Sequence, residues 1–146
     1  MKYQLIDYGI PSFKVFATGI PVSSRFLRTY DKHEIFNFFK LNPNKKLILF
    51  FGGGEFGLGK ERTINIFKYL CQNTDKYQIV AISGKNQKMK NSFENFVTEK
   101  NANDIKIFEY TDKIPELMHI SSLVITKPGG LTSSESLASR STYYSY

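Results

Sequence analysis

The sequence predicts an α/β domain built around a doubly wound parallel sheet. From Lys45 onward, short apolar runs of strand length alternate with longer segments whose apolar residues recur at helical spacing. Strands that are apolar throughout need helices on both faces of the sheet, joined by right-handed crossovers. Two glycine-rich turns, residues 52–59 and 128–131, directly follow the first and the last of these strands.

The composition is that of one folded domain. Of 146 residues, 41% are hydrophobic and 15% aromatic, which is enough for a real core. The formal net charge of +7 suits an anionic partner, such as a nucleotide phosphate or an acidic membrane surface. A nucleic-acid binder is disfavoured, because the aromatic residues follow core periodicity and do not alternate with Lys and Arg. The single cysteine, Cys71, excludes an internal disulfide and is expected to be a buried, inert thiol.

The first 26 residues are expected to form a joint, outside the core. A short helix around Leu5 and Ile6, an extended stretch from Phe13 to Ala17 and a turn over residues 18–21 are expected. The first residue would fall within that helix, with no strand before it. We therefore expect that a further segment precedes this one.

The expected elements of the domain itself begin with a helix over residues 31–40, with Asp31 as its N-cap and Glu34 at the third position. The strands are expected at residues 47–51, 78–83, 105–108 and 122–126, and the helices between them at 60–72, 88–100 and 113–119. If the strand order is the usual 3-2-1-4, the first and fourth strands are neighbours. Both glycine turns then meet at the crevice outside their carboxyl ends.

The most informative stretch runs from Leu123 to Ala138 and predicts a strand, a tight turn and a helix. The apolar strand stops at residues 127–130, Lys-Pro-Gly-Gly. Thr132 and Glu135 match the S/T-x-x-E capping box, which makes Thr132 the expected N-cap of the helix. The amides and the positive dipole end at this helix start would suit a phosphate, which the glycines allow to approach. Alternatively, the glycines only form a sharp turn and Glu135 only caps.

The first glycine turn partly matches two phosphate-binding patterns. Residues 52–57 contain G-x-G-x-x-G, but a dinucleotide site also needs an acidic residue after the second strand, where residues 83–85 are Ser-Gly-Lys. Residues 54–60 contain G-x-x-x-x-G-K, but Glu61 replaces the Ser or Thr that would hold magnesium. We expect a surface that a ligand from the other side of the crevice approaches closely. The alternative is a flexible strand-to-helix turn.

Several motifs together resemble the diacylglycerol glycosyltransferases, a family that includes monogalactosyldiacylglycerol synthase and the processive diacylglycerol glucosyltransferases. They are TGIPV at 18–22, GGG at 52–54, SGKN at 83–86, YTD at 110–112, PELM at 115–118 and TKPGGLT at 126–132, followed by Glu135. The resemblance covers nearly the whole chain in the right order. It implies a Rossmann-like fold, the C-terminal, donor-binding half of a two-domain GT-B enzyme, in a truncated form.

The resemblance implies a UDP-sugar as donor substrate, with no cofactor and no obligatory metal. Gly129, Gly130 and nearby amides would take the diphosphate, Glu135 the ribose hydroxyls and residues 108–114 the uracil. Tyr110 would flank the base or, alternatively, be a core aromatic. The nucleotide-binding residues expected are Gly53, Gly54, Phe108, Tyr110, Ile114, Gly129, Gly130, Leu131, Thr132 and Glu135, and the possible donor contacts are Lys85, Asn86 and Lys127. For Lys85 and Asn86 the alternative is a solvated turn.

The reaction implied by the resemblance is inverting transfer of a hexose to diacylglycerol or a related lipid. A general base would deprotonate the acceptor, while the helix dipole and amides stabilise the departing UDP. The base and the lipid acceptor would belong to the N-terminal domain, so no catalytic residue is expected here. His33 and His119 are expected to be ordinary surface or capping residues. Such a protein would be cytoplasmic and peripheral on the inner face of the cell membrane.

The expected organisation has three parts. Residues 1–26 are a remnant of the N-terminal domain and the interdomain joint, 27–138 the UDP-sugar-binding domain, and 139–146 an atypical tail. The tail is expected to form no fifth strand, which would leave the strand at 122–126 as an exposed edge. Two interpretations of function stay open: a lipid hexosyltransferase half that is inactive alone, or a stand-alone nucleotide-binding or interaction module that has lost catalysis.

Overall fold

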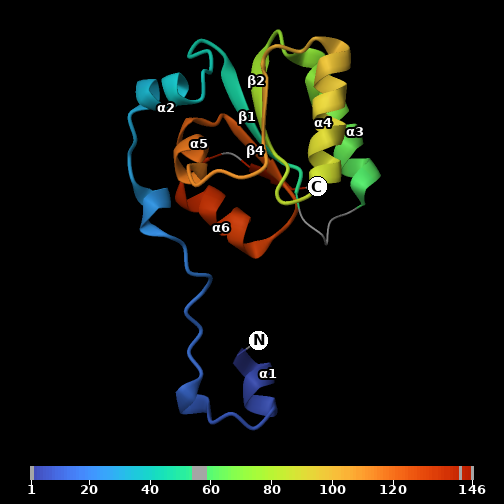
Figure 1. Cartoon of the computed structure of the whole chain (residues 1–146). Coiled ribbons are helices and arrows are strands. Elements are labelled where there is room, and N and C mark those ends of the chain that lie inside the picture. The colour runs from blue at the N-terminus through green and yellow to red at the C-terminus, as the bar shows by residue number, and fades with distance from the viewer. Residues whose placement is uncertain (1, 54–58, 142, 146) are drawn as a thin grey trace.

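A five-stranded parallel sheet forms the centre of the molecule. The computed structural model describes residues 2–53, 59–141 and 143–145 (Figure 1). The strands are β1 (Lys46–Phe51), β2 (Tyr77–Ile82), β3 (Ile105–Phe108), β4 (Leu123–Thr126) and β5 (Tyr143–Ser145). Their order is β3-β2-β1-β4-β5, and every neighbouring pair is parallel. The predicted fold class and the order 3-2-1-4 of the first four strands are confirmed.

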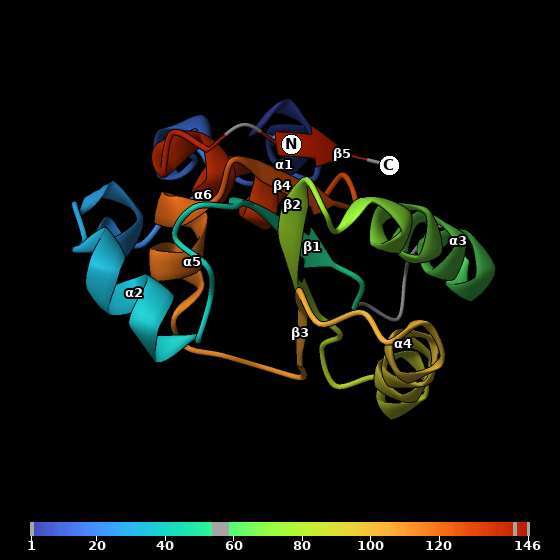
Figure 2. The same cartoon turned by 90° about the horizontal axis from the view of Figure 1, so that it is seen from above.

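Helices cover both faces of this sheet, as Figure 2 shows from above. The helices are α1 (Lys2–Asp7), α2 (Lys32–Phe38), α3 (Lys60–Leu70), α4 (Gln87–Lys100), α5 (Ile114–Ile120) and α6 (Gly130–Ala138), with 3-10 turns η1 (Ser12–Lys14), η2 (Ser24–Leu27) and η3 (Cys71–Asn73). α3 and α4 lie on one face, and α2, α5 and α6 on the other (Figures 1 and 2). In the described parts of the chain, every helix is too short or too polar to cross a membrane.

Strand β1 separates two apolar cores. Its residues from Leu47 to Phe50 are all buried, as expected for a strand covered on both faces. Because successive side chains point to opposite faces, Leu49 joins the core under α2 and α5, and Phe50 joins the core under α3 and α4. In the second core the rings of Phe67 and Phe93 stack with their centroids 4.1 Å apart.

Local capping explains where two of the helices begin. The carboxylate of Asp31 accepts hydrogen bonds from the amides of His33 and Glu34, which confirms Asp31 as the N-cap of α2. The side chain of Asn86 accepts from the amide of Met89 and caps α4. Cys71 is buried as expected, and burial raises the pKa of its thiol to about 12.

The predicted capping box at the start of α6 is wrong. The helix begins at Gly130, with Gly129 as N-cap, and no side chain in the described part of the chain makes a capping hydrogen bond to it. Thr132 is therefore the third residue of the helix and its hydroxyl cannot cap. The cause is the backbone of Gly129, which is extended at φ −109° and ψ 131°, so the helical conformation starts directly after it. Glu135 lies more than one turn into the helix and does not cap.

The expectation for the tail is also wrong. β5 pairs in parallel with β4 through the registers Val124 to Tyr143 and Ile125 to Tyr144. The turn before it is held by the hydroxyl of Ser141, which donates to the carbonyl of Met118 at 2.6 Å. The strand needs no apolar run, because backbone pairing and β-forming tyrosines suffice at a sheet edge. The described tail therefore covers the edge of β4 that was expected to be bare.

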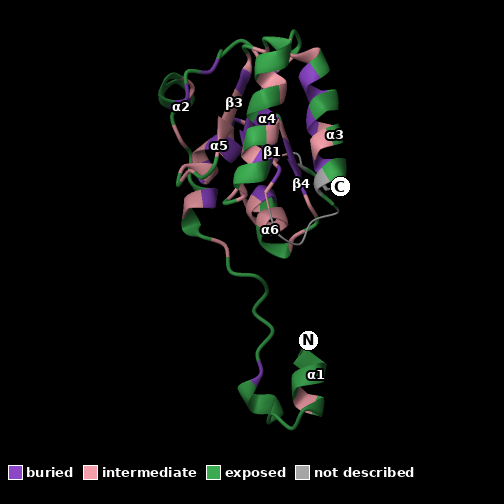
Figure 3. Cartoon of the chain, turned by 45° about the vertical axis from the view of Figure 1, so that its right-hand side comes forward, coloured by how far each residue is buried: buried purple, intermediate pink, exposed green. Residues whose placement is uncertain are grey.

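The N-terminal arm, residues 2–22, extends away from the sheet (Figure 1). Helix α1 is present as expected, but η1 occupies the first part of the stretch expected to be extended from Phe13. Figure 3 shows most of the arm as exposed. The chain joins the core at η2, where Phe26 is buried against the core under α2 and α5.

Candidate functional site

Both glycine turns lie at the carboxyl edge of the sheet. Strands β1 and β4 are parallel neighbours, with Phe50 opposite Ile125. Gly52 and Gly53 directly follow β1, and residues 127–130 follow β4. The expectation that the two turns leave the sheet side by side is confirmed for these residues, whereas Gly54 lies outside the described part of the chain.

An open hollow of about 270 Å³ lies at this edge. Its lining comes from the end of β1, the segment between β3 and α5, η2 and α6. The lining residues are Ser23, Arg25, Phe26, Phe51, Tyr110, Thr111, Asp112, Ile114, Pro115 and Glu135. Three predicted nucleotide-binding residues, Tyr110, Ile114 and Glu135, are thus brought together, although the last two are 21 positions apart in the sequence.

Glu135 is the only carboxylate of α6 and lines the hollow. Its side chain is half-buried, and burial raises the pKa of its carboxyl group. Within residues 2–53, 59–141 and 143–145, no hydrogen bond or ion pair reaches this carboxylate. A partly dehydrated acceptor without a donor is unfavourable, so the site suits a ligand that brings hydroxyl groups.

The two aromatic residues predicted around the base have different surroundings. Tyr110 is 78% exposed at the rim of the hollow, so the alternative that it is a core aromatic is excluded. Phe108 does not line the hollow. Its ring packs edge-on against Phe39 with centroids 5.5 Å apart, and its carbonyl accepts from the amide of Ser83 at 2.9 Å. Any contact of Phe108 with a ligand would therefore be through its backbone.

The glycines after β1 are needed for packing. A Cβ on Gly52 would lie 2.5 Å from the ring of Phe93, and a Cβ on Gly53 would lie 2.5 Å from the carbonyl oxygen of Ser83. Real Cβ atoms do not come so close to other heavy atoms. The backbone after β1 therefore approaches the end of β2 directly. The close approach predicted for this turn exists, and the neighbouring atoms belong to the protein.

The turn after β4 has more open surroundings. Among the atoms of the described residues, a Cβ on Gly129 would meet only the carbonyl oxygen of Lys127, at 3.9 Å. Leu131 is 56% exposed and Thr132 is half-buried, and neither lines the 270 Å³ hollow. The first amides of a helix have no acceptor within the helix, and no side chain of the described residues caps α6. Its start therefore presents free amides and the positive end of the helix dipole.

The three possible donor contacts are placed differently. Lys85 is exposed after β2, whereas the side chain of Asn86 is engaged in capping α4. Lys127 is half-buried directly before the glycine turn, and its carbonyl accepts from the amide of Gly129 at 2.7 Å. Of the three, Lys127 lies nearest in sequence to the start of α6.

Arg25 is a site residue that sequence reasoning missed. Its guanidinium donates to both carboxylate oxygens of Glu116, at 3.1 and 3.3 Å, and to the carbonyl of Asp112 at 2.9 Å. These bonds to Glu116 raise the pKa of Arg25. The pair joins residues 91 positions apart, so no local pattern announces it. The available signal was that Arg25 follows the TGIPV motif closely.

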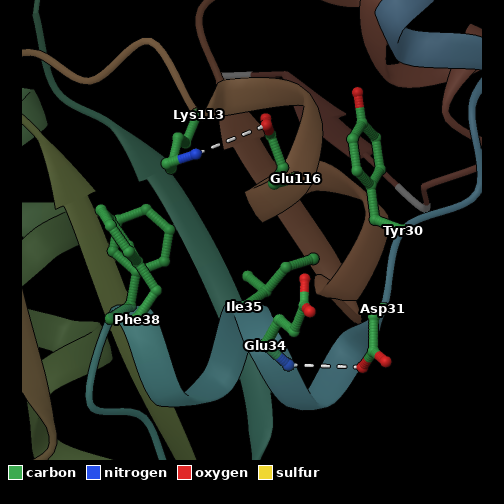
Figure 4. A pocket seen from close by; sticks show the side chains of 8 residues that line it. Tyr30, Asp31, Glu34, Ile35, Phe38, Lys113 and Glu116 are labelled. Atoms are coloured by element: carbon green, nitrogen blue, oxygen red, sulfur yellow. Dashed lines mark hydrogen bonds and ion pairs between the residues drawn. The ribbon is translucent and has the colours of Figure 1, made fainter.

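A second hollow of about 200 Å³ lies between α2 and α5 and is lined in part by Glu116, the partner of Arg25 (Figure 4). Its lining residues are Tyr30, Asp31, Glu34, Ile35, Phe38, Phe39, Lys113 and Glu116. Lys113 points toward Glu116 at 3.9 Å and lies over the ring of Phe38 at 5.1 Å. Nε2 of His119 accepts from the amide of Tyr30 at 3.5 Å, which is a structural contact. Of the charged groups that line this hollow, Lys113 and Glu116 are thus paired with each other, and Asp31 accepts from backbone amides.

Comparison with known proteins gives a family match. The family described as glycosyltransferase family 28 C-terminal domain matches residues 47–141. Processive diacylglycerol beta-glucosyltransferases of Bacillus cereus (strain AH187) and Bacillus thuringiensis (strain Al Hakam) are each 36% identical over 141 residues. These alignments cover 94% of this chain and 34% of each relative, so the chain spans about a third of their length.

Solved structures of sugar-nucleotide enzymes and glycosyltransferases share the fold. A glycosyltransferase from Rickettsia africae ESF-5 has a TM-score of 0.68 at 17% identity and covers 97% of this chain and 41% of its own. A UDP-GlcNAc 2-epimerase from Neisseria meningitidis, bound to UDP-GlcNAc, has a TM-score of 0.60 at 22% identity, covering 88% of this chain and 37% of its own. At such identities the likeness concerns the fold alone.

Proposed function

Because the chain belongs to the family of glycosyltransferase family 28 C-terminal domains, we propose that it binds the UDP part of a UDP-sugar at the carboxyl edge of its sheet. In this proposal the 270 Å³ hollow takes the nucleoside, and the start of α6 takes the diphosphate. The complete protein transfers a hexose to diacylglycerol or a related lipid, as the names of the relatives suggest.

The state of Glu135 carries the proposal. A carboxylate that is half-buried, unpaired in the described structure and raised in pKa can accept two hydrogen bonds from a pair of neighbouring hydroxyl groups. The ribose of a nucleotide offers such a pair. The apolar lining from Phe51, Ile114 and Pro115 supplies a surface for the base, and the exposed ring of Tyr110 can lie over it.

The start of α6 supports the diphosphate part of the proposal. Free first-turn amides and the helix dipole attract anions, and the open space at Gly129 lets a phosphate reach the backbone. The half-buried Lys127 adds a positive charge next to this turn. The proposed reaction inverts the configuration at the anomeric carbon of the sugar. In it these groups stabilise the departing UDP without an obligatory metal or other cofactor.

The remaining parts of the reaction would come from outside this chain. Because the relatives are about three times as long, we place the general base and the lipid-acceptor site in the part that this chain does not match. The chain alone then binds the donor and does not transfer the sugar. The complete protein acts in the cytoplasm, peripherally on the inner face of the membrane.

One observation favours the second interpretation, a nucleotide-binding module that stands alone. The pairing of β5 with β4 leaves the three-residue β5 as the edge strand of the described sheet, and the bond of Ser141 to Met118 holds the turn before it. An edge covered in this way is suited to independent folding. Both interpretations share the nucleotide site. A second protein, made of the two thirds of a relative that this chain does not match, distinguishes them. Adding it should produce hexose transfer if the chain is a transferase half, and should produce none if the chain stands alone.

Calorimetric titration tests the nucleotide site. We expect UDP to bind more tightly than ADP, and Glu135→Ala to weaken UDP binding by about 10- to 150-fold, since a hydrogen bond to a charged group contributes about 1.5–3 kcal/mol. The matched control is Glu99→Ala, which removes an exposed carboxylate from α4. Equal UDP affinity in the wild type and Glu135→Ala would remove Glu135 from the site.

A further inference from the structure

A side chain of the N-terminal arm, that of Ile20, lies against the start of α6, the proposed diphosphate site. Cδ1 of Ile20 lies 2.7 Å from the position that a Cβ on Gly130 would occupy. Real Cβ atoms essentially never show so short a contact, so with any other residue at position 130 the end of the Ile20 side chain would have to shift. A Cβ on the neighbouring Gly129 would meet no atom of the arm within 4 Å. The two glycines therefore differ, because Ile20 of the arm lies against Gly130 and no atom of the arm lies against Gly129.

The position of Ile20 is set from both sides. Before it, Gly19 has φ +78°, a conformation that glycine adopts readily and other residues rarely do. After it, the chain reaches η2, which contacts α6 and α5 and buries Phe26. Ile20 also lines a hollow of about 380 Å³ within the arm, together with Leu5, Val15 and Phe16 among others. It links the arm to the first turn of α6.

We propose that Ile20 is a positioning residue for the diphosphate of the donor. Its side chain, which is 50% exposed, forms an apolar wall beside the first turn of α6 and shields that side of the first amides from part of the water. Interactions between amides and an anion strengthen where water is excluded and the dipoles are held in place. This inference rests on the proposed function, because it concerns the same site.

The wall acts on the diphosphate and not on the nucleoside. Ile20 is absent from the lining of the 270 Å³ hollow that holds Glu135 and Tyr110. Removing its side chain should therefore weaken UDP binding and leave uridine binding unchanged. A general disturbance of the domain would weaken both. The ratio of the two affinities thus separates a positioning role from a structural one.

Titration of UDP and uridine, followed by amide NMR spectra of the wild type and Ile20→Ala, tests the proposal. We expect the UDP dissociation constant to rise by about threefold to tenfold and the uridine value to stay the same. The matched control is Phe13→Ala, which removes an apolar side chain of the same arm that is 72% exposed. It should leave both values unchanged. An unchanged or tighter UDP affinity in Ile20→Ala would overturn the role of Ile20.

The failure of the proposed function looks different. If the wild-type protein binds neither UDP nor uridine, the proposed nucleotide site is wrong, and the proposed role of Ile20 is wrong with it. If Ile20→Ala binds both ligands and the ratio of its UDP affinity to its uridine affinity equals that of the wild type, only the proposed role of Ile20 is wrong. The spectra recorded in the titration also show whether each variant is folded.

A double-mutant cycle keeps the test sharp. Gly130→Ala places a methyl group 2.7 Å from Cδ1 of Ile20, so it should displace the end of the Ile20 side chain and weaken UDP binding. In the Ile20→Ala background the added methyl group has no arm side chain to displace, and its effect on UDP affinity should be smaller. Equal effects of Gly130→Ala in the two backgrounds would show that the contact with Ile20 does not act on the diphosphate.

Discussion

The two glycine turns look alike in the sequence and serve different ends in the structure. After β1, Gly52 and Gly53 lack side chains because the ring of Phe93 and the backbone of Ser83 occupy that space. After β4, Gly129 faces open space and Gly130 receives the arm. A glycine after a strand can thus be required for two reasons. It can make room for close packing within the protein, or it can leave the first amides of the following helix accessible to a ligand. Only the second leaves amides for a ligand.

This difference also explains why the site is asymmetric. In the described part of the first turn, the backbone after β1 packs against the backbone after β2. The second turn contributes the free helix start and, further along α6, the carboxylate of Glu135. The chemistry that suits a nucleotide therefore comes mainly from the segment after β4 and from the segment between β3 and α5.

The largest expected effect distinguishes the two turns by stability. Gly53→Ala forces a Cβ to within 2.5 Å of the Ser83 carbonyl oxygen and should lower the free energy of unfolding by about 1–3 kcal/mol, as overpacking does. Gly129→Ala has room and should change it by less than about 0.5 kcal/mol. Urea denaturation measures both. Similar losses in the two variants would contradict the distinction.

A smaller effect concerns the tail that covers the strand leading into the second turn. Ser141→Ala removes the hydrogen bond to the Met118 carbonyl and should lower the free energy of unfolding by about 1 kcal/mol. Ser92→Ala is the control, since that hydroxyl bonds within an exposed part of α4. Denaturant titration of both variants is the measurement. A loss no greater than that of the control would mean that the tail does not stabilise the edge.

The smallest expected effect concerns pH. Burial raises the pKa of Glu135 in the folded protein, so the folded state binds its proton more tightly than the unfolded state. The charged carboxylate therefore destabilises the fold above the folded pKa, and this effect disappears as the pH falls below the unfolded value. Because solvent screens a half-exposed group, the effect should be below about 1 kcal/mol.

Thermal unfolding of Glu135→Gln measures this effect. The variant should melt slightly above the wild type at pH 7, and the difference should vanish below about pH 3, where the wild-type carboxyl is protonated in both states. A variant that is less stable than the wild type at pH 7 would show that the charge of Glu135 has a partner in the fold.

The sequence alone determined the elements and their order in the sheet. The apolar runs at β1 to β4 and the helical spacing between them are local patterns, and parallel connections allow few topologies. The N-cap at Asp31 was predictable because its partners are two and three residues away. The placement of Glu135 and Tyr110 in one hollow followed from a resemblance, since their spacing alone does not bring them together.

Only the tertiary structure decided the start of α6, the strand in the tail and the pairing of Arg25 with Glu116. A capping pattern offers one possible helix start, but the extended backbone of Gly129 set the actual one. The tail pairs because β4 presents unpaired backbone groups beside it. Arg25 and Ile20 meet residues about 90 to 110 positions away, and such contacts depend on how packed segments meet in space, which no local propensity encodes.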